Sequence, residues 1–277
     1  MAQLRSWGLR PEIGPHALDE HGYLAGWDRD RLADLNAAVR DPGVRAVLAT
    51  RGGKGAYRIA DGLDVHALRA DPKPLVGFSD ITVLHLAIAR HAGVASLHGP
   101  MASWDDDLVG PDAIDRLRGA LMSADPVLVE SDPAEPTAAL TTSGRVTGVL
   151  LGGNQDAIAT CAGWALPPLR GAVLLLEAFN LRLGHIDRQL TMLGNAGHLD
   201  GVVGVAVGQY TRCGPEESEP QDWSHLSVLQ DHLDRLGVPV LGGLPIGHGP
   251  DPRSVPLGTT AVLDADAGTL EIEPAAL

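Results

Sequence analysis

The residue best placed for nucleophilic chemistry is Ser79, in the stretch KPLVGFSDITVLHLAIARHAG from Lys73 to Gly93. Leu75 and Val76 are typical of a strand, and apolar residues after Ser79 recur at helical spacing, so the serine falls on a strand-to-helix bend. One interpretation is a helix N-cap, because serine is a favoured capping residue. The other is a nucleophile whose exposed hydroxyl faces the positive end of the helix. This stretch alone leaves both interpretations open.

A serine nucleophile needs a general base, usually a histidine that a carboxylate orients. The chain has 11 histidines, so position matters more than presence. His248 lies in LPIGHGPDPRSVPLG, a loop dense in Gly and Pro that suits a functional group, although an exposed histidine without function would also fit. Glu177 follows the apolar run from Val173 to Leu176. At the end of a strand it could orient an imidazole, or it could be an ordinary strand-terminal acid.

The elements that must position these residues alternate between helix and strand in the first half of the chain. Residues 28–41 have helical spacing, residues 44–50 are typical of a strand, and VASLHGP follows the helix after Ser79 as the next strand. This alternation predicts a mostly parallel sheet in an α/β layer fold. The strand ends carry RGGKG, GFSD and HGPM, which we expect to converge on one edge of the sheet, where sites form in such folds.

The second half of the chain has a different character, which predicts a domain boundary. Residues 123–144 are rich in Pro, Ser, Thr and Asp and have little helical periodicity, so we interpret residues 126–144 as a linker. Residues 1–125 then form an N-terminal domain with the nucleophile. Residues 145–277 form a second domain with Glu177 and His248, rich in glycine and short strands, with helices expected at 185–197 and 227–237.

Composition narrows the class of protein. With 277 residues, 44% hydrophobic and 20% charged, the chain is typical of a globular protein of one or two domains. A net charge of −14 argues against nucleic-acid and anionic-membrane partners. Cys161 and Cys213 lie far apart without CxxC spacing, which indicates free thiols in a reducing compartment. The start lacks the apolar segment of a signal peptide and no apolar run is long enough to span a bilayer, so we expect a cytoplasmic protein.

Several motifs, in order along nearly the whole chain, match one known family. They are GYLAGWDRDRLADLNAAVRDPGVRAVLATRGGKG, PKPLVGFSDITVLH, LHGPM, GVLLGGN, LLLEAFN with HIDRQLTML, and GHGPDPRSVPLG. The chain resembles the serine LD-carboxypeptidases of the muramoyltetrapeptide carboxypeptidase type, which include microcin C immunity peptidases. An ordered series of motifs is more specific than any one of them, so the resemblance favours the nucleophile over the cap at Ser79.

The resemblance implies a role for each candidate. Ser79 would be the nucleophile, Glu177 the orienting acid and His248 the base, although GFSD is not the G-x-S-x-G elbow of α/β-hydrolases. Backbone N–H groups of Gly53 and Asp80 would form the oxyanion hole. The implied fold is a flavodoxin-like N-terminal domain and a β-rich α+β C-terminal domain, with the site at their interface. The family needs no metal or organic cofactor, and no HExxH or CxxC spacing appears.

The sequence departs from the family pattern in three places. It starts at LRSWGLRPEIG, which resembles the end of the family's first helix and its second strand, so one strand-plus-helix unit of roughly 30 residues looks absent. Leu181 and Gly184 stand where the family usually has Glu and Tyr, and Lys54 replaces the tyrosine of the glycine-rich turn. We expect the last three changes to alter substrate binding and to leave the triad intact.

Four other polar or aromatic residues have weaker candidacies. His98 could line the site, but we interpret it as structural. Asp187 and Arg188 lie on a predicted helix, where an intrahelical or interface salt bridge is the expected role. Trp164 could contact a ligand or pack at the edge of the second domain.

The predicted function is a serine carboxypeptidase that releases a terminal D-amino acid from an L,D-linkage in peptidoglycan-derived muropeptides, acting as a homodimer. The alternatives are a self-immunity peptidase for a peptidyl- or aminoacyl-nucleotide antibiotic, and an inactive binding or scaffold protein. A nucleotide needs an aromatic platform, and Trp164 has no obvious insertion around it. The loop from Tyr210 to Trp223 carries an acidic run that would repel phosphate, which favours the muropeptide.

Overall fold

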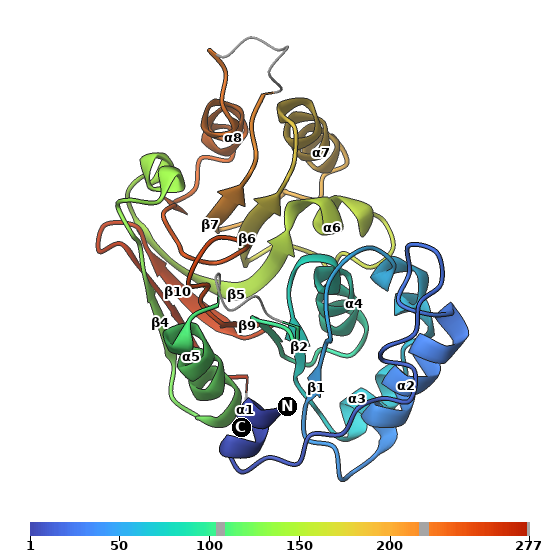
Figure 1. The fold of residues 1–277 in the computed structure, drawn as a ribbon. Coiled ribbons are helices and arrows are strands. Elements are labelled where there is room, and N and C mark those ends of the chain that lie inside the picture. The colour runs from blue at the N-terminus through green and yellow to red at the C-terminus, as the bar shows by residue number, and fades with distance from the viewer. Residues whose placement is uncertain (104–108, 216–221, 276–277) are drawn as a thin grey trace.

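Two β-sheets form the framework of the computed structural model, which describes residues 1–103, 109–215 and 222–275 (Figure 1). The smaller sheet has the order β1-β2-β3-β9, and the larger has the order β4-β11-β10-β5-β6-β7-β8. In the smaller sheet β1, β2 and β3 are parallel and β9 is antiparallel. In the larger sheet β5 to β8 are parallel, and β4, β11 and β10 pair antiparallel. The chain is therefore a two-domain α/β protein, and both of its sheets are mixed.

The strands are β1 (Val47–Leu48), β2 (Leu75–Gly77), β3 (Ser96–His98), β4 (Val127–Glu130), β5 (Arg145–Asn154), β6 (Ala172–Phe179), β7 (Gly204–Thr211), β8 (Val240–Leu241), β9 (Val255–Leu257), β10 (Thr260–Asp264) and β11 (Thr269–Ile272). The α-helices are α1 (Ala2–Ser6), α2 (Asp28–Arg40), α3 (Val65–Ala70), α4 (Thr82–His91), α5 (Pro111–Met122), α6 (Gln155–Thr160), α7 (Leu183–Asn195) and α8 (His225–Asp234). Short 3₁₀ helices are η1 (Ala56–Arg58), η2 (Ala60–Gly62), η3 (Ser79–Ile81) and η4 (Pro136–Leu140). No helix in these described ranges is long and apolar enough to cross a membrane.

The helices expected from apolar spacing form as α2, α4, α7 and α8. Helix α8 begins two residues earlier than expected, because Ser224 caps it. The Ser224 hydroxyl accepts the N–H of Ser227, and the Ser227 hydroxyl accepts the N–H of Ser224, which completes a capping box. The apolar pattern therefore located the helix, and the cap set its first residue.

Two segments have a structure that the sequence did not predict. The segment that resembles a second strand forms none, since no strand precedes β1 in residues 1–46, where Pro11 and Pro15 lack ladder donors. Within residues 126–144, interpreted as a linker, the chain forms β4 and η4. Strand β4 pairs with β11 in the register Val127↔Ile272, so this stretch is an edge of the larger sheet.

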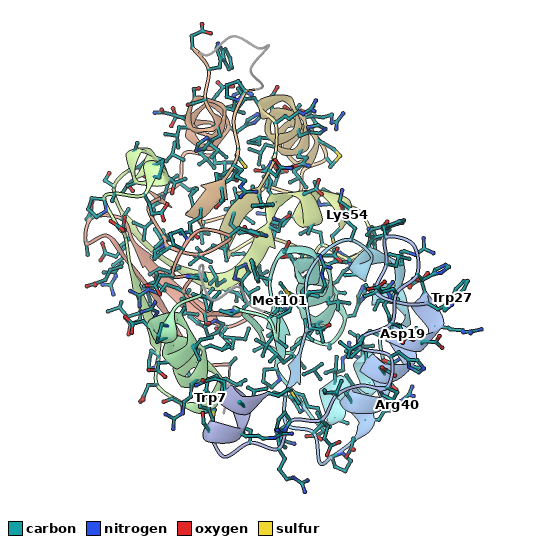
Figure 2. All side chains as sticks on the ribbon, in the orientation of Figure 1. Trp7, Asp19, Trp27, Arg40, Lys54 and Met101 are labelled. Atoms are coloured by element: carbon teal, nitrogen blue, oxygen red, sulfur yellow. The ribbon has the colours of Figure 1, made fainter. Side chains whose placement is uncertain are left out.

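The large sheet has the most deeply buried strands. Val173 to Leu176 in β6 are completely buried, because parallel strands covered on both faces are apolar along their whole length. Side chains fill the space between the ribbons (Figure 2), with Met101 buried in the interior and Trp27 exposed at the outer edge of the molecule.

Two contacts tie the sheets together around the candidate site. Strand β9 comes from the C-terminal half but pairs with β3 of the smaller sheet, with Val255 opposite His98. At the end of β5, a Cβ on Gly153 would lie 2.8 Å from Thr82 Oγ1, and the Asn154 N–H donates to that hydroxyl at 3.1 Å. Glycine at 153, with φ of +126°, therefore lets β5 of one sheet meet the start of α4 beside the other.

Candidate active site

Ser79 lies where β2 ends and η3 begins, and its backbone is left-handed. Its φ is +63°, a region that non-glycine residues seldom adopt and that costs about 1–3 kcal/mol. The residue that precedes η3 is Phe78, and no side-chain capping hydrogen bond forms there, so the N-cap interpretation is wrong. The bend instead presents a half-buried hydroxyl at the end of a strand, which is the placement that a nucleophile needs.

Glu177 and His248 form a hydrogen-bonded pair, with His248 Nδ1 2.7 Å from Glu177 Oε2. Glu177 belongs to β6 and is completely buried, whereas His248 lies in the loop between β8 and β9 and its side chain is 13% exposed. With Nδ1–H donated to the carboxylate, Nε2 is the nitrogen left to accept a proton. This is the arrangement of a general base with its orienting acid.

The carboxyl group of Glu177 is held ionised by its neighbours. Burial alone would raise the pKa of Glu177, but the charge and hydrogen bond of His248, helped by His98, outweigh burial and lower the pKa to about 2. A buried carboxylate without such a partner would take up a proton. Glu177 is therefore negatively charged at neutral pH and able to stabilise an imidazolium.

Two phenylalanines hold the imidazole of His248 between them. The centroid of its ring lies 4.7 Å from that of Phe78 and 4.9 Å from that of Phe179. Phe78 directly precedes Ser79, so this contact brings the serine's segment against the base. The structure has no direct hydrogen bond between Ser79 and His248 among the described residues, and hydrogen bonds between catalytic groups are often long before substrate binds.

The glycine-rich turn after β1 packs against the Ser79 bend. A Cβ on Gly52 would lie 3.2 Å from Ser79 Cβ and 3.4 Å from Ser79 Oγ, so a side chain there would crowd the hydroxyl. The Asp80 carboxylate accepts the N–H of Ala56 at 2.9 Å and so ties the turn to the bend. Burial raises the pKa of Asp80, although the N–H groups of Ala56 and Gly55 oppose this rise. The expected oxyanion donors, the N–H groups of Gly53 and Asp80, belong to these two tied segments, and their role stays a prediction.

His98 is buried at the end of β3, beside the acid. Its Nε2 lies 4.0 Å from Glu177 Oε1, and neither of its ring nitrogens has a hydrogen-bond partner within the described ranges. His98 therefore faces the side of the carboxylate that His248 does not use. Its position supports a structural role beside the acid more than that of a second base.

Two of the weaker candidates have structural contacts. Asp187 Oδ1 lies 2.8 Å from His232 Nε2, which joins α7 to α8 as the interface pair that was expected. Trp164 packs against the core and donates its Nε1–H to the carbonyl of Thr160 at 2.7 Å. The cysteines are free thiols, and burial raises the pKa of Cys161 to about 12 and contributes most to a pKa of about 11 at Cys213.

The sequence did not point to two residues that position the imidazole of His248 and its loop. Phe179 stands two residues after Glu177 in β6, so it shares a face of the strand with the acid, a spacing that could have indicated it. Gln209 accepts the N–H of Gly249 at 2.8 Å and donates to Glu135 at 2.7 Å, which fixes the loop of His248. No local pattern marks Gln209, because its partners are distant in sequence.

Comparison with known proteins gives matches over both halves of the chain. The LD-carboxypeptidase N-terminal domain matches residues 1–99, and the LD-carboxypeptidase C-terminal domain matches residues 147–263. A Streptomyces coelicolor protein, provisionally named a carboxypeptidase, is 44% identical over 99% of this chain and 87% of its own length. The Bacillus subtilis protein named a probable murein peptide carboxypeptidase is 36% identical over 98% of this chain and 84% of its own. The murein tetrapeptide carboxypeptidase of Pseudomonas aeruginosa is 33% identical over 96% of this chain and 87% of its own.

Solved structures show the same fold. The muramoyltetrapeptide carboxypeptidase from Oxalobacter formigenes superimposes with a TM-score of 0.80 at 29% identity, covering 92% of this chain and 87% of that one. The microcin C7 self-immunity protein in complex with aspartyl sulfamoyl adenosine gives a TM-score of 0.86 at 22% identity, covering 98% and 88%. The second likeness concerns the fold alone.

Proposed function

The chain belongs to the LD-carboxypeptidase family, and we propose that it is a serine carboxypeptidase that releases a terminal D-amino acid from murein-derived peptides by hydrolysing an L,D-peptide bond. The observation that carries this proposal is the buried pair of His248 and Glu177, 2.7 Å apart, beside the left-handed bend at Ser79. A buried carboxylate that holds an imidazole with one nitrogen free is the chemistry that a serine hydroxyl requires.

In the proposed reaction, Ser79 Oγ attacks the carbonyl carbon of the scissile bond while His248 Nε2 takes the hydroxyl proton. Ionised Glu177 stabilises the imidazolium that results, and the N–H groups of Gly53 and Asp80 bind the oxyanion. Collapse of the intermediate breaks the C–N bond, and His248 gives its proton to the departing amine. Water, activated by the same histidine, then hydrolyses the acyl-enzyme and restores Ser79.

The substrate class is supported by the relatives that cover nearly the whole chain. Two of them, at 36% and 33% identity, are named for murein peptides, whereas the immunity protein resembles this chain at 22% identity. Leu181 replaces a polar residue of the family in the loop after β6, so the pocket differs from the usual pattern even though the acid and base pair as expected. The acidic run expected to repel a nucleotide phosphate, residues 216–219, lies outside the described residues.

The test is hydrolysis of a murein tetrapeptide that ends in L,D-linked D-Ala, with the products separated by liquid chromatography and identified by mass. We expect D-Ala and the tripeptide from the wild type and neither from Ser79→Ala. Cleavage of a peptidyl-adenylate mimic with no D-Ala released from the tetrapeptide would assign the immunity activity instead. Turnover of neither substrate would favour a binding or scaffold protein.

A further inference from the structure

Four non-glycine residues of the described chain have a left-handed backbone, and all four lie around the candidate site. Ser79 is the proposed nucleophile, Asn180 follows Glu177 by three residues, and Asp251 follows His248 by three residues. Strained backbone of this kind tends to persist where function requires it. Asn and Asp adopt this conformation more readily than other residues, but Arg212, with φ of +54°, has no such preference.

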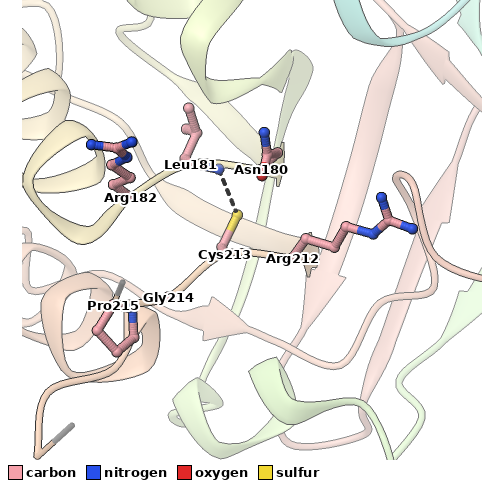
Figure 3. A pocket seen from close by; sticks show the side chains of 7 residues that line it. All are labelled: Asn180, Leu181, Arg182, Arg212, Cys213, Gly214 and Pro215. Atoms are coloured by element: carbon pink, nitrogen blue, oxygen red, sulfur yellow. Dashed lines mark hydrogen bonds between the residues drawn. The ribbon is translucent and has the colours of Figure 1, made fainter. Parts of the chain in front are cut away.

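The ends of β6 and β7 hold Arg212 in this conformation. Phe179 pairs with Thr211, and the Asn180 N–H donates to the Thr211 carbonyl at 2.9 Å, so the two strand ends turn together. A surface pocket of about 430 Å³ opens here, lined by residues 180–182 and 212–215 (Figure 3). In Figure 3 the side chains of Arg182 and Arg212 extend in opposite directions from these loops.

The turn places the guanidinium of Arg212 over the aromatic ring that stacks on His248. Its central carbon lies 5.6 Å from the centroid of the Phe179 ring, and that ring stacks on His248 at 4.9 Å. Arg212 and His248 therefore both contact the ring of Phe179. A guanidinium that lies over an aromatic face keeps its N–H groups available at its edge.

The charge of Arg212 is not neutralised within the described part of the chain. Among those residues its side chain contacts the Phe179 ring, and the side chain is exposed. Asp251, by contrast, has its carboxylate occupied by Arg116. A guanidinium that pairs with no carboxylate of the described residues, near the proposed base, is suited to bind a planar anion by two parallel hydrogen bonds.

We propose that Arg212 binds the terminal carboxylate of the amino acid that leaves, and so restricts the reaction to the end of a peptide. This inference rests on the proposed function. The spacing fits: a carboxylate carbon lies about 2.5 Å from the amide nitrogen of its own residue, and the hydrogen bonds to base and arginine add roughly 3 Å each. His248 and Arg212 both contact the Phe179 ring, at 4.9 Å and 5.6 Å from its centroid, so they are no farther apart than the sum of these two distances, and a residue of this length can reach both.

The experiment compares the murein tetrapeptide with its C-terminal amide, for the wild type, Arg212→Gln and Arg212→Lys. In the wild type, amidation should lower kcat/KM by about 10- to 100-fold, mainly through KM, because a charge-assisted hydrogen-bond pair is lost. In Arg212→Gln the free acid should fall to the level of the amide, with little further effect of amidation. Arg212→Lys keeps the positive charge but cannot form two parallel hydrogen bonds to the carboxylate. Its kcat/KM for the free acid should lie between those of the wild type and Arg212→Gln.

Arg29→Gln is the matched control, because Arg29 is also exposed and also lies over an aromatic ring, that of Trp27 at 5.8 Å. This variant should discriminate between acid and amide as the wild type does. Wild-type enzyme that is indifferent to amidation, or Arg212→Gln that still discriminates fully, would overturn the role of Arg212 alone. Failure of the wild type to release product from either peptide would instead overturn the proposed function, and this inference with it.

Discussion

Replacing Glu177 by Gln removes the charge of the orienting acid while keeping nearly the same shape. The carboxylate is completely buried, and its Oε2 accepts from His248 Nδ1 at 2.7 Å. The amide oxygen of Gln can accept the same hydrogen bond, so the imidazole should stay in place between its two phenylalanines. What the variant loses is the negative charge beside the imidazolium that forms during the reaction.

The expected loss follows from the electrostatics of that contact. Two unit charges whose centres are about 4 Å apart attract by about 4 kcal/mol at the effective dielectric constant typical of protein sites. If the transition state carries the full positive charge on His248, losing this attraction slows the reaction on the order of 10³-fold.

The assay is the steady-state release of D-Ala from the tetrapeptide across a range of pH, with the melting temperature measured for each variant. The matched control is Asp187→Asn, because Asp187 also pairs with a histidine, His232, at 2.8 Å, but on α7 away from Ser79. This control should keep wild-type turnover. A Glu177→Gln enzyme within tenfold of wild type, or an equal loss in Asp187→Asn, would refute the assignment of Glu177 as the acid.

Ser79→Ala and His248→Ala should each lower turnover on the order of 10⁴- to 10⁶-fold with little change in melting temperature, because the triad acts as a unit. His98→Ala should lose far less, and a His98 variant as inactive as His248→Ala would contradict the choice of base. Asp80→Asn should lower kcat about 10- to 100-fold, because it weakens the hydrogen bonds that hold the glycine-rich turn; unchanged kcat would show that the turn is fixed otherwise. Glu177, whose pKa falls from 4.5 to about 2, stabilises the folded state above pH 4.5 and loses this contribution as pH falls toward 2. The gap in melting temperature between wild type and Glu177→Gln should therefore shrink below pH 4.5, and a gap independent of pH would contradict the ion pair.

The sequence predicted those parts of the fold that local pattern controls. Helices α2, α4, α7 and α8 follow from apolar periodicity, and the alternation of strand and helix indicated the α/β class. It did not predict β4, because an edge strand in a segment rich in Pro and Ser has its pairing supplied by β11, far along the chain. It also could not show that the expected second strand would lack a partner.

The residues of the candidate site also fall into those that local sequence patterns indicate and those that depend on tertiary packing. Glu177 and His248 were recognisable because a charged residue inside an apolar run and a histidine in a Gly- and Pro-rich loop are locally unusual. Phe179 and Arg212 act through contacts that form only when β6 and β7 end side by side, and neither residue type is unusual in its own segment. Left-handed backbone at Ser79 likewise depends on the packing of the bend, which residue types alone do not reveal.

The loop that carries His248 is fixed at both ends, by different sheets. The Arg253 N–H donates to the Pro245 carbonyl at 2.7 Å and so closes the loop. The Gly249 N–H donates to the side chain of Gln209, a residue of the larger sheet. At its end β9 pairs with β3 of the smaller sheet, where Val255 lies opposite His98. Just after β9, the Gly258 N–H donates to the Leu150 carbonyl of β5 at 2.8 Å, so movement of one sheet against the other would have to break this bond or the β3–β9 ladder. The acid and base can therefore be preorganised before a substrate binds, and differences in what relatives of this chain cleave should arise from residues such as Leu181 and Arg212 at the strand ends.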